Sequence, residues 1–361
     1  MKDVNKNCPC EKYESSFEVK NYKKFDHELT SELKRIMKLL IKPKKGFLDL
    51  SEPRDKFPEP SNLKFLNGFS DVLSSDELSE YVTGVIVDSG TAISMISSGS
   101  WKLPKVMMHK NIVTGVRIDQ GRVPLFGTYD EKVTQGLDGL HDKCLMLKKN
   151  NCHFTTWKIE FKISDQWPSS LAVIDNALTS ARYASVTQST GMIPIINLQI
   201  KNLPKANYSI FRALDAHHKI LSTLFSSLNQ YHVSLENLIL MLAIIEPGIN
   251  NPAYHQPCTL ADYTSSLLSK VLPASVPAII FTHTNNSPEE KFIINLNALA
   301  RDSNPKSWKL SFHCLRTAGN PSKNISMSTL ALIDNLKKIS EASDGQADEQ
   351  ELYQSLIRHW D

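Results

Sequence analysis

Eight short segments of strand character recur along the chain. Each is rich in β-branched, aromatic or other large apolar residues, and most are continuously apolar, which is typical of strands covered on both faces. We predict strands over residues 46–50, 83–88, 112–119, 157–163, 192–200, 238–245, 277–283 and 308–314.

Helical patterns lie before and between these strands. Apolar residues at helical spacing predict a first helix over residues 28–40, which Pro43 ends. Further helices are predicted over residues 169–190, 208–230 and 287–300. The alternation of eight strands with helices predicts an α/β fold, a single (βα)8 TIM barrel, with a doubly wound open sheet as the alternative.

The N-terminal segment has a different composition from the rest. Residues 1–27 are polar and rich in lysine, and their apolar residues follow no clear period. We therefore predict a loosely ordered arm over residues 1–27 and a barrel over residues 28–361.

Composition and charge exclude several classes of protein. The chain is 41% hydrophobic and 22% charged, which is typical of a folded globular protein. Its 41 basic and 38 acidic side chains give a net charge of +3, too balanced for a dedicated nucleic-acid binder. The apolar runs are too short for a membrane span, and the N-terminus has no apolar core like that of a secretory signal, so we expect a cytoplasmic protein.

The cysteines are sparse. Their spacing fits neither a disulfide framework nor a zinc site, so we expect reduced thiols, no metal and no cofactor. They are Cys8, Cys10, Cys144, Cys152, Cys258 and Cys314.

Several motifs in the middle of the chain resemble one family. Residues 123–128 (VPLFGT), 134–140 (TQGLDGL), 181–185 (ARYAS) and 294–298 (INLNA) are similar, in the same order, to motifs of class I fructose-bisphosphate aldolase. The resemblance covers about residues 29–340. It implies a (βα)8 barrel and the glycolytic cleavage of fructose 1,6-bisphosphate, a lyase reaction.

The resemblance also implies a catalytic lysine, and this chain departs from the family there. In the family a lysine attacks the substrate ketone to form a Schiff base. The family's LEGTLLKPN corresponds to residues 235–243 (LENLILMLA), which puts Met241 at the lysine, and a thioether cannot form an imine. Two further active-site lysines of the family correspond to Arg117 and Thr156.

The acidic residues of the family are replaced as well. Its VEPEI corresponds to residues 196–200 (INLQI), so Asn197 and Gln199 stand at two glutamates that handle protons. Its AADES corresponds to residues 49–53 (DLSEP), so Ser51 stands at the catalytic aspartate. Amides and a hydroxyl have no basicity near pH 7. We therefore expect a catalytically inactive binding or structural protein, a pseudoenzyme in which the Schiff base is lost.

The phosphate-binding half of the site is partly retained. The family's Ser-Gly-Gly is replaced by residues 283–285 (HTN), whereas Arg316 stands at the arginine that grips phosphate. Arg316 either still binds an anion or pairs with an acid of this chain. His283 and His313 end two strands and either meet as acid–base or metal-binding groups or, with no third ligand evident, are structural. The family also implies a longer segment between Glu52 and Val85 and a mobile C-terminal tail.

Lys158 allows a second interpretation. Residues i and i+2 of a strand point the same way, so Lys158 lies about 6–7 Å along the strand from Thr156, on the same side. It could form a relocated Schiff base, with Arg316 binding substrate beside it and residual or altered lyase activity as the result. The alternative, which we favour, is a rim cation that stands at an arginine of the family and pairs with a nearby acid.

The expected partners follow from the resemblance. They are a sugar phosphate, further copies of the chain as in the family's homotetramer, or another protein such as a cytoskeletal one. A barrel mouth filled by Met241, His283 and His313 would favour the inactive protein, and an open pocket beside Lys158 the altered enzyme.

Overall fold

The computed structural model describes residues 27–51, 70–201, 203–253, 255–283, 288–315 and 329–348, together with residues 350, 352 and 354. The arm predicted for residues 1–27 lies outside this part of the chain, except for His27, where the first helix begins. The prediction of an arm and a barrel as separate parts stays a prediction.

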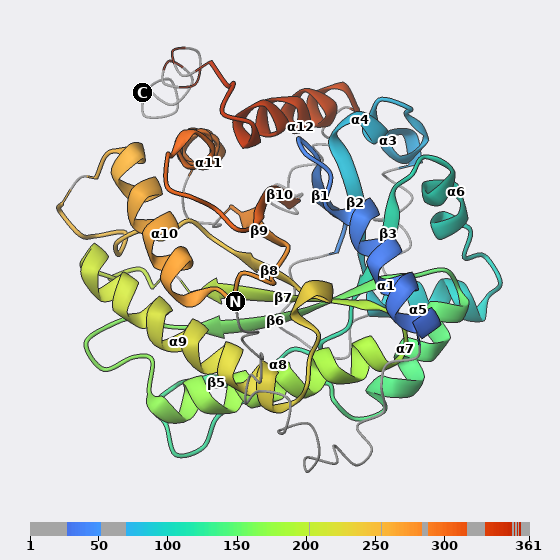
Figure 1. The fold of residues 1–361 in the computed structure, drawn as a ribbon, viewed down its shortest axis with the longest axis horizontal. Coiled ribbons are helices and arrows are strands. Elements are labelled where there is room, and N and C mark those ends of the chain that lie inside the picture. Colours follow the sequence, from blue (N-terminus) through green and yellow to red (C-terminus); the bar gives the residue numbers. More distant parts are fainter. Residues whose placement is uncertain are drawn as a thin grey trace, which may run out of the picture.

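Eight parallel strands form a closed barrel, in the order β1-β10-β9-β8-β7-β6-β3-β2 (Figure 1). This confirms the predicted (βα)8 fold and excludes the open sheet. The strands are β1 (Gly46–Asp49), β2 (Val82–Asp88), β3 (Val113–Arg117), β6 (Phe154–Phe161), β7 (Ile193–Ile200), β8 (Ile239–Leu242), β9 (Ala278–Thr282) and β10 (Lys309–Leu315).

Helices surround the barrel on its outside (Figure 1). The four helices predicted from periodicity are confirmed within two residues at each end, as α1 (His27–Leu40), α8 (Ser170–Ser189), α9 (Ile210–Gln230) and α11 (Glu289–Arg301). The others are α3 (Ser70–Ser74), α4 (Leu78–Tyr81), α5 (Ser89–Ser97), α6 (Leu103–His109), α7 (Leu140–Lys149), η2 (Leu235–Asn237), α10 (Pro257–Val271) and α12 (Thr329–Ser343).

Two strand boundaries differ from the prediction by three residues, and the others by at most two. Strand β6 begins at Phe154, three residues before the predicted start at residue 157, because Phe154, Thr155 and Thr156 are themselves strand formers. Strand β8 covers only four residues of the apolar run 238–245. An apolar run indicates which residues are buried, and buried residues extend beyond those that pair in the sheet, so the run is longer than the strand.

A small hairpin was not predicted. Strands β4 (Arg122–Pro124) and β5 (Lys132–Thr134) pair antiparallel between β3 and α7. Each strand is only three residues long, so neither carries a readable alternation of apolar and polar residues.

Side-chain caps fix where several helices begin. The Ser169 hydroxyl accepts a hydrogen bond from the Ala172 backbone N–H at α8, and the Ser209 hydroxyl accepts one from the Arg212 N–H at α9. The Asp88 carboxylate accepts a hydrogen bond from the Thr91 backbone N–H at α5, which begins directly after β2. Such caps satisfy backbone donors that have no partner within the helix, so they fix the residue at which each helix begins.

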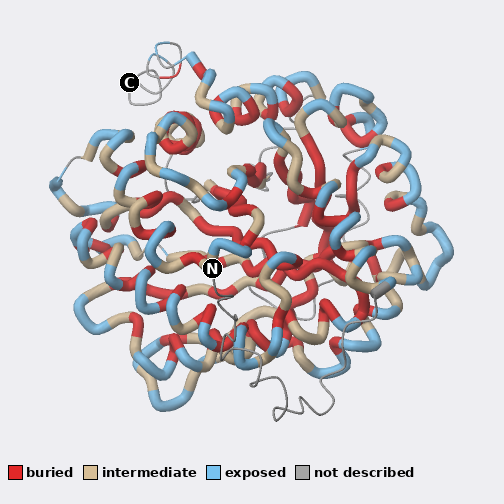
Figure 2. The backbone as a smooth tube through the Cα atoms, in the orientation of Figure 1, coloured by how far each residue is buried: buried red, intermediate tan, exposed pale blue. Residues whose placement is uncertain are grey.

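Apolar side chains form two clusters, one outside and one inside the strands. The larger lies between the strands and the surrounding helices, so buried residues follow the strands and exposed ones the outer helix faces (Figure 2). The smaller lies inside the barrel and includes Phe47 and Phe154, whose rings meet edge to face at 5.6 Å. A β-carbon at Gly115 would overlap the Phe154 ring, so glycine is needed there.

Helix α1 closes the amino-terminal end of this inner cluster. Its buried Leu33, Ile36, Met37 and Leu40 belong to the same cluster as the first inward-facing residues of the strands. Helix α1 contacts β2, β3 and β7, and it crosses in front of the strands in Figure 1. The barrel interior is therefore apolar and closed at this end, which leaves the opposite, carboxyl-terminal end for chemistry.

In the part of the chain that is described, no helix combines the length and apolarity needed to cross a membrane.

Candidate functional site at the carboxyl end of the barrel

Strand alternation brings the predicted site residues to one place. On each strand, residues of the inner cluster alternate with residues of the outer cluster, so the inward-facing positions can be read along the chain. The described residues predicted for the site all share the inward-facing parity: Ser51, Arg117, Thr156, Lys158, Asn197, Gln199 and Met241. Arg316 lies outside the described residues.

Met241 is fully buried inside the barrel. It belongs to the inner cluster with Ile195, Ile239 and Ile280, and its exposed fraction is 0%. In the register of β7 and β8 it lies beside Asn197. Its side chain thus ends the apolar interior directly below the polar residues of the mouth, and it offers no nucleophile.

Three neighbouring strands contribute a hydrogen-bonded chain of side chains. The His313 Nε2 lies 3.1 Å from an Asp49 carboxylate oxygen, and its Nδ1 lies 2.9 Å from the Thr282 hydroxyl. All three residues are buried. Burial raises the pKa of Asp49, but the hydrogen bond and charge of His313, the hydrogen bond with Ser51 and the charge of Arg117 together outweigh it, so the pKa of this carboxyl is lowered overall. Asp49 is therefore an anion inside the mouth.

The network continues toward β3 through Ser51. The Ser51 backbone N–H donates to the other Asp49 oxygen at 2.8 Å, and the Ser51 hydroxyl accepts from Arg117 at 3.1 Å. Just beyond β3, Asp119 is buried and accepts from the backbone N–H of Lys158 at 3.3 Å. Burial raises the pKa of Asp119, and the nearby Arg117 only partly offsets this.

Lys158 faces the interior and has an acidic neighbour. Its Nζ lies 3.7 Å from a Glu160 oxygen, and the other Glu160 oxygen contacts Arg122. The Lys158 side chain is 30% exposed. Lys158 thus faces inward, as the relocated Schiff base would require, and lies close to an acid, as expected for a rim cation. A carboxylate beside an amine favours its protonated form, which is not a nucleophile.

The β7 amides lie beside this pair. In the register of β6 and β7, Asn197 is next to Lys158 and Gln199 is next to Glu160. The Asn197 side-chain oxygen is buried and has no hydrogen-bond partner among the described residues. Thr156, one step below on β6, is buried beside Ile195 and Arg117.

The two histidines singled out in the sequence have different surroundings. Both ring nitrogens of His313 contact other groups, as described above, whereas the ring of His283 lies 5.9 Å from that of Phe292. Among the described residues, no group of three or more His, Cys, Asp or Glu side chains could hold a metal ion. Four cysteines are described, and all four are free thiols.

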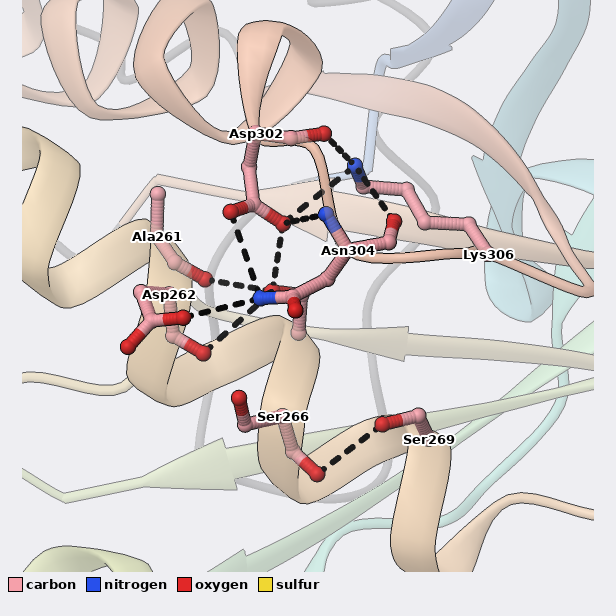
Figure 3. Close-up of polar contacts among 8 residues, drawn as sticks. Ala261, Asp262, Ser266, Ser269, Asp302, Asn304 and Lys306 are labelled. Carbon is pink, nitrogen blue, oxygen red and sulfur yellow. Dashed lines mark hydrogen bonds and ion pairs between the residues drawn. The ribbon is translucent and has the colours of Figure 1, made fainter.

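A second polar cluster, outside the barrel, serves as a contrast (Figure 3). Where the chain leaves α11 and approaches β10, Asp302 accepts from Ser265 at 2.6 Å and pairs with Lys306 at 3.4 Å. Asn304 donates to Asp262 and Ser265, at 2.8 and 3.0 Å. These bonds join this loop to α10, and the Asp302 charge is paired within the cluster, so its role is structural.

Sequence reasoning assigned no specific role to several members of the mouth. They are Asp49 and Asp119, which lie at or near the ends of predicted strands, and Arg122, Glu160 and Thr282. The alternation of β6 could have indicated Glu160 two residues after Lys158. The pairing of Asp49 with His313 joins residues 264 apart in the chain, and no local pattern reports it.

Comparisons with known proteins point to one family. Residues 69–355 match the family model for class-I fructose-bisphosphate aldolase. Fructose-bisphosphate aldolase B of Gallus gallus is 36% identical over 246 residues, covering 68% of this chain and 66% of that protein. Fructose-bisphosphate aldolase C of Rattus norvegicus is 35% identical over 239 residues, covering 66% and 65%. The chain thus spans slightly less than two thirds of these relatives.

A solved structure shares the fold. It is the fructose-bisphosphate aldolase of Plasmodium falciparum in complex with TRAP and a small-molecule inhibitor, with a TM-score of 0.77 and 24% identity, covering 90% of this chain and 98% of that one. At that identity the likeness concerns the fold alone. With the family model, the two relatives and the closed barrel taken together, this chain belongs to the class-I fructose-bisphosphate aldolase family.

Proposed function

We propose that this chain is an aldolase-fold protein that does not cleave sugar phosphates through a Schiff base and acts instead as a binding or structural protein. The observation that carries the proposal is Met241. It occupies the position that corresponds, by resemblance, to the family's Schiff-base lysine, and it is fully buried among isoleucines. Covalent attachment of a ketone needs an amine there.

The surrounding residues support the same conclusion. Ser51, at the position of the family's aspartate, accepts a hydrogen bond from Arg117. Asn197 and Gln199, at the positions of two glutamates, face the interior as neutral amides. In the family, a lysine attaches the substrate covalently and carboxylates transfer protons. Both kinds of residue would have to be reintroduced in this chain to restore cleavage.

Lys158 favours a second candidate function, residual or altered lyase activity. It faces the interior on the same side of β6 as Thr156, so a substrate in the mouth could reach it. Its proximity to Glu160 disfavours this function, since a Schiff base requires a neutral amine.

A cleavage assay separates the two functions. We expect fructose 1,6-bisphosphate cleavage by the wild type to stay at the background rate and to be the same for Lys158→Met. The matched control is Lys270→Met, which removes an exposed lysine in the last turn of α10, where the chain approaches the amino-terminal end of β9. Cleavage that Lys158→Met abolishes and Lys270→Met retains would establish the second function instead.

The remaining expectations form part of this proposal. A ligand of the sugar class, a second copy of the chain or another protein is the proposed partner, and a cytoplasmic location is proposed from the sequence. The complex with TRAP is a property of the Plasmodium falciparum aldolase, and we do not propose TRAP as a partner of this chain. Light scattering during size-exclusion chromatography tests self-association, and a monomer at all concentrations would exclude the homo-oligomer.

A further inference from the structure

In the described part of the polar network at the mouth, three carboxylates lie among three side chains of lysine and arginine. The carboxylates of Asp49, Asp119 and Glu160 stand against the basic groups of Arg117, Arg122 and Lys158. Glu160 contacts both Arg122 and Lys158, and Arg117 lowers the pKa of both Asp49 and Asp119 relative to burial alone. A phosphate dianion entering this network would find basic groups that already have internal counter-charges, and it would lie near buried carboxylates.

Asp49 and His313 are the residues most at odds with phosphate binding. By the motif resemblance they stand at the first alanine of AADES and at the serine of SYGR, so the aldolase pattern has an uncharged small residue at both positions. Here they form a buried hydrogen-bonded pair at 3.1 Å, with Asp49 8% and His313 2% exposed. The pair places a carboxylate and an imidazole near the strand ends where the family holds a phosphate.

Two neutral amides of the mouth, Asn197 and Gln199, have hydrogen-bonding capacity for a ligand. The Asn197 side-chain oxygen is buried inside the mouth without a partner among the described residues, which costs free energy until a donor reaches it. Gln199 lies two residues further on the same face and is half-buried, so its amide is accessible to a ligand. Two amides on one strand face offer both donors and acceptors, the set that pairs with hydroxyl groups.

We propose that the mouth binds an uncharged polyhydroxylated molecule, a free sugar or polyol, through Asn197 and Gln199, and that the Asp49–His313 pair excludes phosphate esters. The proposal rests on the non-catalytic function proposed above and narrows the ligand of the same site. The proposed ligand is therefore an unphosphorylated sugar or polyol, in place of the sugar phosphate expected from the family resemblance. The imidazole of His313, held by Asp49 and Thr282, keeps the carboxylate in place.

Ligand titration tests the specificity. The probes are D-fructose, glycerol and fructose 1,6-bisphosphate, each titrated into the full chain at constant ionic strength and followed by NMR of the protein and the ligand. We expect D-fructose to bind at least tenfold more tightly than the bisphosphate. Asn197→Ala should weaken D-fructose at least fivefold, whereas Asn229→Ala, which alters an exposed residue at the end of α9, should leave it unchanged.

A gain-of-binding variant tests the exclusion of phosphate. The double variant Asp49→Ala/His313→Ser restores the small residues of the family pattern, and we expect it to bind fructose 1,6-bisphosphate at least tenfold more tightly than the wild type does. If it does not fold by circular dichroism, Asp49→Asn removes the charge at nearly constant shape, and the same gain, in smaller measure, is expected.

Two outcomes would overturn the inference: tighter binding of the bisphosphate than of D-fructose by the wild type, or no binding of D-fructose or glycerol at the mouth. Neither outcome bears on the lack of cleavage, since both concern reversible binding. Conversely, a covalent adduct on a barrel lysine would refute the proposed function, whatever the affinity for neutral sugars.

Discussion

The amino-terminal and carboxyl-terminal ends of the barrel interior differ in what fills them. At the amino-terminal end, Leu33, Ile36, Met37 and Leu40 of α1 seal an apolar cluster. At the carboxyl-terminal end, Asp49, His313, Arg117, Lys158 and Glu160 form polar contacts with one another or with their neighbours. Stability therefore depends mainly on the first end and recognition on the second, and Met241 lies at their boundary.

Substitution at that boundary should have the largest effect. Met241→Lys would place an amine among buried isoleucines, where desolvation lowers a lysine pKa by roughly 3–5 units, which at pH 7 is equivalent to about 4–5 kcal/mol of unfolding free energy. Met241→Leu keeps the volume and should cost less than about 1.5 kcal/mol. Urea unfolding of the two variants measures the difference, and equal stability would show that Met241 borders water.

The apolar plug should show the next largest effect. Leu40→Ala removes a side chain with 0% exposure and should destabilise the chain by about 2–5 kcal/mol, through lost burial and the cavity left behind. Leu330→Ala, at a 77% exposed residue, should change the unfolding free energy by less than about 0.5 kcal/mol. Similar losses for both would contradict the plug.

His153 gives the amino-terminal end a dependence on mild acid. Burial, followed by the positive charge of Lys148, lowers the pKa of His153 to about 4. Between about pH 6.5 and pH 4 the unfolded chain binds a proton there that the folded chain does not, so stability falls as the pH decreases through this window. His153→Gln should flatten this part of the stability curve, and His218→Gln, at an exposed residue, should not.

Asp49 should make the folding stability depend on pH to a smaller extent than His153 does, and only in stronger acid. Because its pKa is lowered in the folded chain, its contribution is fully present above the ordinary carboxyl value of about 4 and is lost as the pH falls through the lowered value. The stability of Asp49→Asn should therefore vary less than that of the wild type between pH 4 and pH 2. Parallel curves in that range would mean that Asp49 is not ionised in the mouth.

The sequence predicted the fold better than it predicted the site. Continuous apolar runs such as residues 192–200 and 277–283 mark buried strands directly, so the barrel could be recognised from them. The hairpin of β4 and β5 was missed because its strands are too short for a period.

The site could be predicted only in part. Alternation along a strand indicates the face on which a residue lies, but not which residues of other strands it contacts. Alternation along β6 placed Lys158 on the same side of the strand as Thr156, whereas Asn197 and Gln199 were found only through the family resemblance. The Asp49–His313 contact depends on the register of β1 and β10, in which Phe47 pairs with His313, and this register is set by closure of the whole barrel. Arg316, which the family pattern singled out, lies outside the described residues.

The most direct test of the central claim is borohydride trapping. The full chain is incubated with fructose 1,6-bisphosphate or dihydroxyacetone phosphate and reduced, and any adduct is located by intact mass and peptide mapping, which detects an imine even when turnover is slow. With Met241 at the Schiff-base position and Lys158 beside Glu160, we predict no adduct. An adduct on Lys158 or another barrel lysine would contradict the account and show that the chain retains covalent chemistry.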